Sequence, residues 1–81
     1  MVTVLYRQRH GYDVRIHSDD HLPAHVHVWK DNRELIIELR QMRIRKNSGF
    51  NSREVREILA LLREHEVLLR ETWLRWHGSL E

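Results

Sequence analysis

Residues 25–39 read HVHVWKDNRELIIEL, and this stretch is the most informative about how the strands pair. Two runs rich in apolar and β-branched residues flank Asp31-Asn32, a pair of residue types that favours tight turns. If this pair is a two-residue turn, residue 28 lies opposite residue 35, and residue 25 lies opposite Glu38. A three-residue loop would instead bury the charge of Glu38 among the valines, at a high cost in free energy. The stretch therefore predicts a β-hairpin with the shorter turn.

The two faces of this hairpin differ in chemistry, because side chains alternate along a strand. One face is apolar and is expected to form the core: Val26, Val28, Leu35, Ile37 and Leu39. The other face carries His25, His27, Trp29, Glu34, Ile36 and Glu38. Both histidines are therefore expected to point away from a helix that covers the apolar face.

Further strands are expected on both sides of the hairpin. Residues 3–8 and 12–17 are rich in β-branched and aromatic residues, and His10-Gly11 between them has the residue types of a turn. Residues 18–24 contain an Asp pair and one proline, which predicts a loop. Residues 42–46 alternate apolar and basic side chains and predict a short edge strand.

From Asn51 onward the apolar period becomes helical. Asn51 and Glu54 have the spacing of a capping box, and Gly78 stands where a helix would end. Apolar residues recur at intervals of three and four: Val55, Ile58, Leu59, Leu62, Leu69, Trp73 and Trp76. We therefore predict an α+β fold, a small antiparallel sheet of four to five strands over about residues 3–46. One long C-terminal helix over about 52–77 is expected to cover one face.

Some apolar residues of this helix lie partly off the core-facing stripe: Leu61, Val67, Leu68 and Leu74. They predict a second apolar surface for a partner protein or for a second copy of the chain, which would give a homodimer.

Composition limits the possible classes of protein. The 81 residues include no cysteine, which excludes disulfides and thiolate metal sites. No run of about eighteen apolar residues is present, and the polar start lacks the apolar stretch of a signal peptide. We therefore expect a single domain over residues 1–81, located in the cytoplasm and without membrane contact.

Histidine is the anomaly of this composition, with seven residues in the chain. His25 and His27 emerge from one face of a strand at a separation that one metal ion can bridge, and His21 is a candidate third ligand. Asp20 or Glu38 can complete such a site or orient an imidazole, with zinc, manganese or nickel as candidate ions. Without metal, the same residues supply the general base and general acid that cleavage of an RNA phosphodiester requires. A purely structural role on the solvent face of a sheet stays open.

A basic segment follows the hairpin and carries four cations: Arg40, Arg43, Arg45 and Lys46. On a regular strand Arg43 and Arg45 share a face, and arginine forks bind phosphate well. Such a patch predicts contacts with the backbone of RNA or DNA, and Trp29 on the histidine face is a candidate for base stacking. The alternative is an edge strand that charge keeps soluble.

The run Asp20-His21-Leu22-Pro23-Ala24-His25-Val26-His27 resembles the hallmark Asp/Glu-His-x-Pro-Pro-His-x-His of a small bacterial family, domain of unknown function 4160. The resemblance extends from Thr3 to about Trp76, and Ala24 departs from it where relatives have a second proline. It implies a place in small two-gene operons, often beside a protein of the domain-of-unknown-function-2442 type, and a role in toxin–antitoxin pairs. It also adds weight to the three histidines of the hallmark.

These observations lead to one hypothesis and one alternative. The hypothesis is a toxin-like component of a type II toxin–antitoxin pair that acts on RNA as a ribonuclease. His25 and His27 would be the acid and base, and the neighbouring groups would orient them: His21, Asp20 and Glu38. The alternative is a non-catalytic protein that binds nucleic acid or its operon partner, with a divalent metal such as zinc on the histidine cluster.

Overall fold

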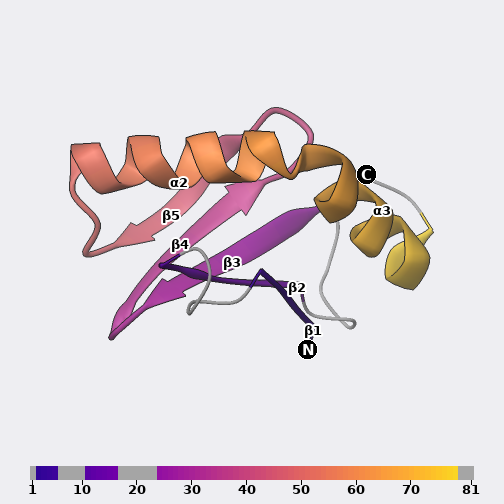
Figure 1. Cartoon of the computed structure of the whole chain (residues 1–81), viewed down its shortest axis with the longest axis horizontal. Coiled ribbons are helices and arrows are strands. Elements are labelled where there is room, and N and C mark those ends of the chain that lie inside the picture. Colours follow the sequence, from indigo (N-terminus) through magenta and orange to yellow (C-terminus); the bar gives the residue numbers. More distant parts are fainter. Residues whose placement is uncertain (1, 6–10, 17–23, 79–81) are drawn as a thin grey trace.

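The computed structural model describes residues 2–5, 11–16 and 24–78, with the backbone alone for residues 2–5 and for Trp76 (Figure 1). Five antiparallel strands form one sheet, in the same order as in the chain. They are β1 (Val2–Leu5), β2 (Asp13–Ile16), β3 (His25–Lys30), β4 (Arg33–Glu38) and β5 (Arg43–Ser48). The prediction of an α+β fold is confirmed. The predicted loop over residues 18–24 lies outside the described residues except for Ala24.

The hairpin of β3 and β4 has the predicted register. His25 lies opposite Glu38, Val28 opposite Leu35, and the pair Lys30 and Arg33 closes the turn. The turn therefore consists of Asp31-Asn32, and Asp31 adopts a φ of 57°. Aspartate is among the few residues besides glycine that tolerate this left-handed region.

The prediction of one continuous helix is wrong, because the chain forms α2 (Ser52–Glu64) and α3 (Glu66–His77). His65 separates them with φ −111° and ψ 22°, and its N–H donates to the carbonyls of Leu61 and Leu62. At this point the chain turns downward past the end of the sheet (Figure 1). A straight helix would extend beyond the sheet, whereas the bend brings Leu69 and Trp73 into the core.

The helices bury the apolar face of the sheet. The largest fully buried side chains come from three strands, the β4–β5 turn and both helices: Val14, Ile16, Val26, Val28, Leu35, Ile37, Leu39, Ile58, Leu62, Leu69 and Trp73. Each of them contributes about 1.5–3 kcal/mol through the hydrophobic effect. The predicted core face of the hairpin is thereby confirmed.

Among the described side chains of α3, three apolar ones are exposed on the surface that faces away from the core: Val67, Leu68 and Leu74. Leu61 at the end of α2 is instead partly buried against the core. No helix in the described part of the chain is both long and apolar enough to cross a membrane.

An ion pair ties the first turn of α2 to the sheet. Nη1 of Arg33 donates to both carboxylate oxygens of Glu54 at 2.8 Å, and the guanidinium lies 4.8 Å from the centre of the Phe50 ring. Glu54 also forms the predicted capping box with Asn51. Gly49 has a φ of 107°, and a Cβ atom there would lie 2.7 Å from Cγ of Arg33. The chain thus needs glycine where β5 leads into the helix.

The pKa of the Glu54 carboxyl lies below its ordinary value of 4.5, because the backbone N–H of Asn51 and the guanidinium of Arg33 favour the charged form. Protonation of Glu54 therefore opposes folding. Its contribution to the free energy of unfolding is present above pH 4.5 and is lost as the pH falls through the lowered pKa.

We therefore expect Glu54→Gln to lower the melting temperature at pH 7. The gap in melting temperature between the variant and the wild type should become smaller as the pH falls below about 4.5. Thermal unfolding followed by circular dichroism between neutral and acid pH measures this difference. Glu71→Gln, at an exposed position of α3, is the matched control and should show a much smaller effect. A Glu54→Gln deficit that is constant over the whole pH range would contradict the prediction.

Candidate functional site

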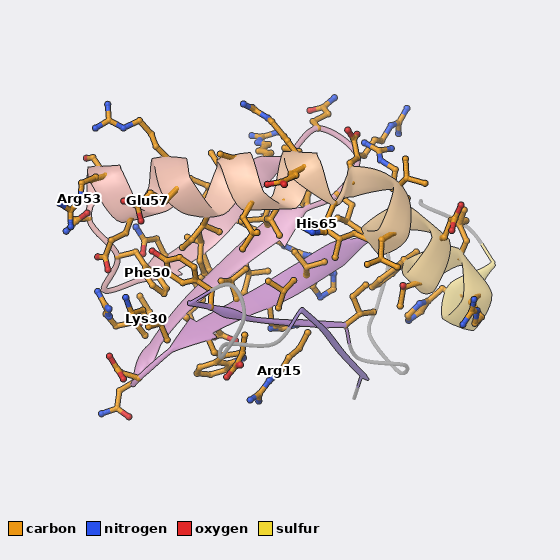
Figure 2. All side chains as sticks on the ribbon, in the orientation of Figure 1. Arg15, Lys30, Phe50, Arg53, Glu57 and His65 are labelled. Atoms are coloured by element: carbon orange, nitrogen blue, oxygen red, sulfur yellow. The ribbon has the colours of Figure 1, made fainter. Side chains whose placement is uncertain are left out.

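The candidate site is the open face, which we define as the side of the sheet opposite α2. The register aligns three rows of side chains across it. The first row is Asp13, Trp29, Glu34 and Ser48, the second is Arg15, His27, Ile36 and Lys46, and the third is His25, Glu38 and Arg43. Figure 2 shows Arg15 on this side of the sheet, away from α2. The first row thus carries two carboxylates, the second row carries two cations, and the third row carries one of each.

His27 forms the main polar contact of the open face. Its Nδ1 lies 3.0 Å from Oε2 of Glu34, and each of the two side chains is 14% exposed. A carboxylate can only accept a hydrogen bond, so Nδ1–H is the donor. In the neutral ring the lone pair of Nε2 is then the basic one.

Lys46 extends this contact toward the edge of the sheet. Its Nζ lies 3.7 Å from Oε1 of Glu34, the oxygen that His27 does not use. The carboxylate of Glu34 therefore lies between an imidazole and an ammonium group.

Glu34 was not among the predicted site residues, although the predicted register contains the signal. The sequence favours Glu38 instead because it is predicted to lie directly opposite His25, and the structure confirms that pairing. Glu34 lies two positions from Ile36, the residue opposite His27, and such diagonal neighbours are within reach of long side chains. The observed imidazole–carboxylate contact is this diagonal one.

The expectation that both histidines point away from the helices is wrong for His25. His25 is only 7% exposed, and its ring centre lies 5.4 Å from that of Trp73. The bend at His65 causes this, because α3 passes the end of the sheet where β3 begins. The rings of His25 and His27 nevertheless remain neighbours, with centres 5.2 Å apart.

Trp73 packs between two imidazoles. Its second neighbour is His77, one turn further along α3, and these rings are stacked with centres 3.7 Å apart and planes 11° apart. Nδ1–H of His77 can donate to the carbonyl of Trp73, which lies 3.1 Å away. His25 is thus part of an aromatic cluster that holds α3 against the sheet.

The predicted metal ligands are only partly within the described residues. His21 and Asp20 lie outside them, whereas His25 and His27 lie close together. Among the described residues no group of three histidine or carboxylate side chains could hold a metal ion. A zinc site on the histidines of the hallmark therefore stays a prediction.

A bulge in β5 changes the predicted arrangement of the basic segment. Arg43 lies opposite Glu38 and Lys46 opposite Ile36, with one extra residue, Arg45, between the regular pairs. Strict alternation would have put Arg43 and Arg45 on one face of the sheet. Because of the bulge, Arg43 and Lys46 share that face instead. These two cations therefore belong to the open face.

The other predicted nucleic-acid contacts lie at different places around this face. Arg45 is exposed in β5, and Arg40 is exposed in the turn between β4 and β5. Nη2 of Arg70 donates to the carbonyl of Arg40 at 3.2 Å, which fixes the backbone of that turn. Trp29 is partly buried in the first row, beside Asp13 and Glu34.

Comparison with known proteins identifies the family. A family model described as Domain of unknown function (DUF4160) matches residues 11–74, most of the chain. The chain belongs to this family. A search of curated proteins found no match, and a search of solved structures found none either. The span that matches the DUF4160 family contains the three rows of the open face and Trp73.

We expect Trp73→Ala to lower the free energy of unfolding by roughly 3–5 kcal/mol, because it removes a fully buried ring and leaves a cavity. Urea unfolding measures this loss. Leu74→Ala is the matched control on the same helix, and its exposed side chain should cost less than about 1 kcal/mol. Equal losses in both variants would show that α3 is not held in the described position.

Proposed function

We propose that this member of the DUF4160 family is a ribonuclease, that its open face binds RNA, and that His27 acts as the general base. The observation that supports this most is the 3.0 Å contact between Nδ1 of His27 and Glu34. A carboxylate in this position selects one tautomer of the imidazole and stabilises the imidazolium that forms after proton transfer. The pair thus has the arrangement of a general base and its orienting group.

The proposed reaction is attack of an RNA 2′-hydroxyl on the neighbouring phosphorus. Nε2 of His27 takes the hydroxyl proton, the new oxygen–phosphorus bond forms, and the bond from phosphorus to the 5′-oxygen breaks. The leaving oxygen takes a proton from a protonated His25, the second imidazole of the pair. The products are a 2′,3′-cyclic phosphate and a 5′-hydroxyl end, and exchange of protons with water restores both histidines.

Access divides the roles between the two imidazoles. His27 is the more exposed ring and therefore receives the base role, in which the substrate must reach Nε2. His25 is nearly buried, so the leaving oxygen would have to approach the edge of its ring that borders His27. His21 and Asp20 keep their proposed orienting roles.

The basic residues around the open face would hold the RNA backbone. Arg15 lies directly beside His27 in the second row, and Arg43 and Lys46 lie on the same face at the edge of the sheet. Guanidinium and ammonium groups bind phosphate, and such binding weakens with salt. Arg40 and Arg45 can extend the contact along the strand, and Trp29 can stack on a base.

We expect the wild type to cleave a labelled RNA oligonucleotide to products with 2′,3′-cyclic phosphate ends, and His27→Ala to be slower by roughly 10²–10⁴-fold. Glu34→Gln should be slower by a smaller factor, because the imidazole remains but loses its charged partner. Gel electrophoresis of the RNA measures the rates, and circular dichroism checks the fold of each variant.

Glu64→Gln is the matched control, since it changes an exposed carboxylate of α2, on the other side of the sheet from His27, and it should cleave RNA as fast as the wild type. Full activity of His27→Ala would exclude the assignment. Salt-dependent RNA binding by a wild type that forms no product would instead favour the non-catalytic alternative, which the exposed cations of β5 also support.

A toxin-like role in a type II toxin–antitoxin pair in the cytoplasm is part of the same proposal, and the family resemblance supports it. Expression of the chain alone should then arrest bacterial growth, because cellular RNA would be cleaved. Co-expression with the product of the neighbouring gene, proposed to be of the domain-of-unknown-function-2442 type, should restore growth. Colony counts after induction measure both effects, with His27→Ala as the control that should not arrest growth. If His27→Ala arrested growth as strongly as the wild type, the toxicity would not result from RNA cleavage by His27.

A further inference from the structure

The outer edge of β5 presents a strand that is paired on one side. β4 lies beside it on the inner side, and none of the other described strands pairs with its outer side. All six side chains from Arg43 to Ser48 are exposed. A strand in this position has a row of backbone donors and acceptors that can pair with another extended chain.

The register shows which backbone groups point outward. The N–H of Leu39 donates to the carbonyl of Ala24 at 2.9 Å, so the odd-numbered residues of β4 turn their backbone groups toward β3. The even-numbered residues of β4 therefore form hydrogen bonds to β5. Ile44 and Asn47 of β5 lie opposite odd-numbered residues of β4, Ile37 and Leu35, so they are not bonded to β4. By the same alternation Ile44 and Asn47 direct their N–H and C=O groups away from the sheet.

The side chains of this edge specify the charge of a partner strand. Arg43, Arg45 and Lys46 lie within four positions, and the side chain of Lys46 is 60% exposed although it contacts Glu34. Ile44 is 40% exposed and offers a small apolar contact on the core side of the sheet. Two copies of β5 side by side would bring these cations together, and like charges across a strand pair are destabilising.

We infer that β5 accepts an extended, acidic segment of a partner polypeptide as a sixth strand. The backbone groups of Ile44 and Asn47 would supply hydrogen bonds, and carboxylates of the added strand would lie near Arg43, Arg45 and Lys46. This interaction needs neither His27 nor any turnover of RNA, so it stands independently of the proposed ribonuclease activity.

The probe is a fluorescein-labelled peptide of about eight residues in which Glu and Val alternate, a length that matches an ordinary strand. Fluorescence anisotropy should show saturable binding that weakens as salt is added. Two control peptides of equal length should not bind: one with Lys in place of Glu, and one with prolines that prevent strand pairing. Binding of the Lys peptide, or no binding of any peptide, would overturn the proposal. The cations of β5 would then serve only to prevent this edge from pairing with a second copy of the chain.

Ile44→Pro tests the backbone contribution directly. It removes an outward N–H and leaves the hydrogen bonds to β4, so affinity should fall by about tenfold. Ile44→Ala also removes the isoleucine side chain but keeps the backbone N–H, so this variant should retain most of the affinity for the Glu peptide. Equal affinities of Ile44→Pro and Ile44→Ala would overturn strand addition and leave only ion pairing.

Charge reversal and amide exchange complete the test without relying on the proline variant. The double variant Arg43→Glu/Arg45→Glu should bind the Lys peptide and no longer the Glu peptide. In the wild type, the Glu peptide should slow hydrogen exchange of the Ile44 and Asn47 amides and leave those of α3 unchanged. Unchanged hydrogen exchange at both the Ile44 and Asn47 amides would overturn the proposal. So would a dimer in sedimentation without peptide, if it protected the same two amides from exchange.

Discussion

The ion pair between Arg33 and Glu54 sets the constraint on which the other features depend. It joins the start of β4 to the first turn of α2, and the same carboxylate closes the capping box with Asn51. A helix that begins at this point must run along the apolar face of the sheet. The opposite face is then left without a helix over most of its area, and His27, Glu34 and Lys46 come together there.

The bend at His65 determines the surroundings of His25. It turns α3 around the end of the sheet, so that Trp73 reaches His25. Two histidines that are two residues apart on one strand thereby acquire different surroundings. One is held in an aromatic cluster, and the other contacts a carboxylate on the open face. Packing at one end of the sheet, and not the alternation of the strand, makes the two imidazoles chemically distinct.

Local rules were sufficient for the parts of the fold in which neighbouring residues carry all the information. The turn at Asp31-Asn32, the register that follows from it and the capping box at Asn51 were all predicted from the sequence. The break at His65 was not, because no proline or glycine marks it and the apolar spacing from Leu62 to Leu69 continues through it. That break depends on where the sheet ends, which is a property of the tertiary structure.

The candidate site shows the same division. Alternation correctly assigned His27 to the open face, but the bulge at Arg45 has no signal in the residue types around it and moved Lys46 to that face. The diagonal contact of His27 with Glu34 depends on the choice between two reachable carboxylates, which side-chain packing decides. Asp20 and His21 lie outside the described residues, so their roles stay predictions.

The order of the strands has a consequence for how the chain folds. Each strand pairs with the strand that precedes it in the sequence, and two residues join β3 to β4. Sheet assembly therefore requires only the closure of short loops, whose entropic cost is small. The docking of α2 and α3 instead joins partners that are distant in the sequence, such as His25 and Trp73, and these non-local contacts are expected to form more slowly than the sheet.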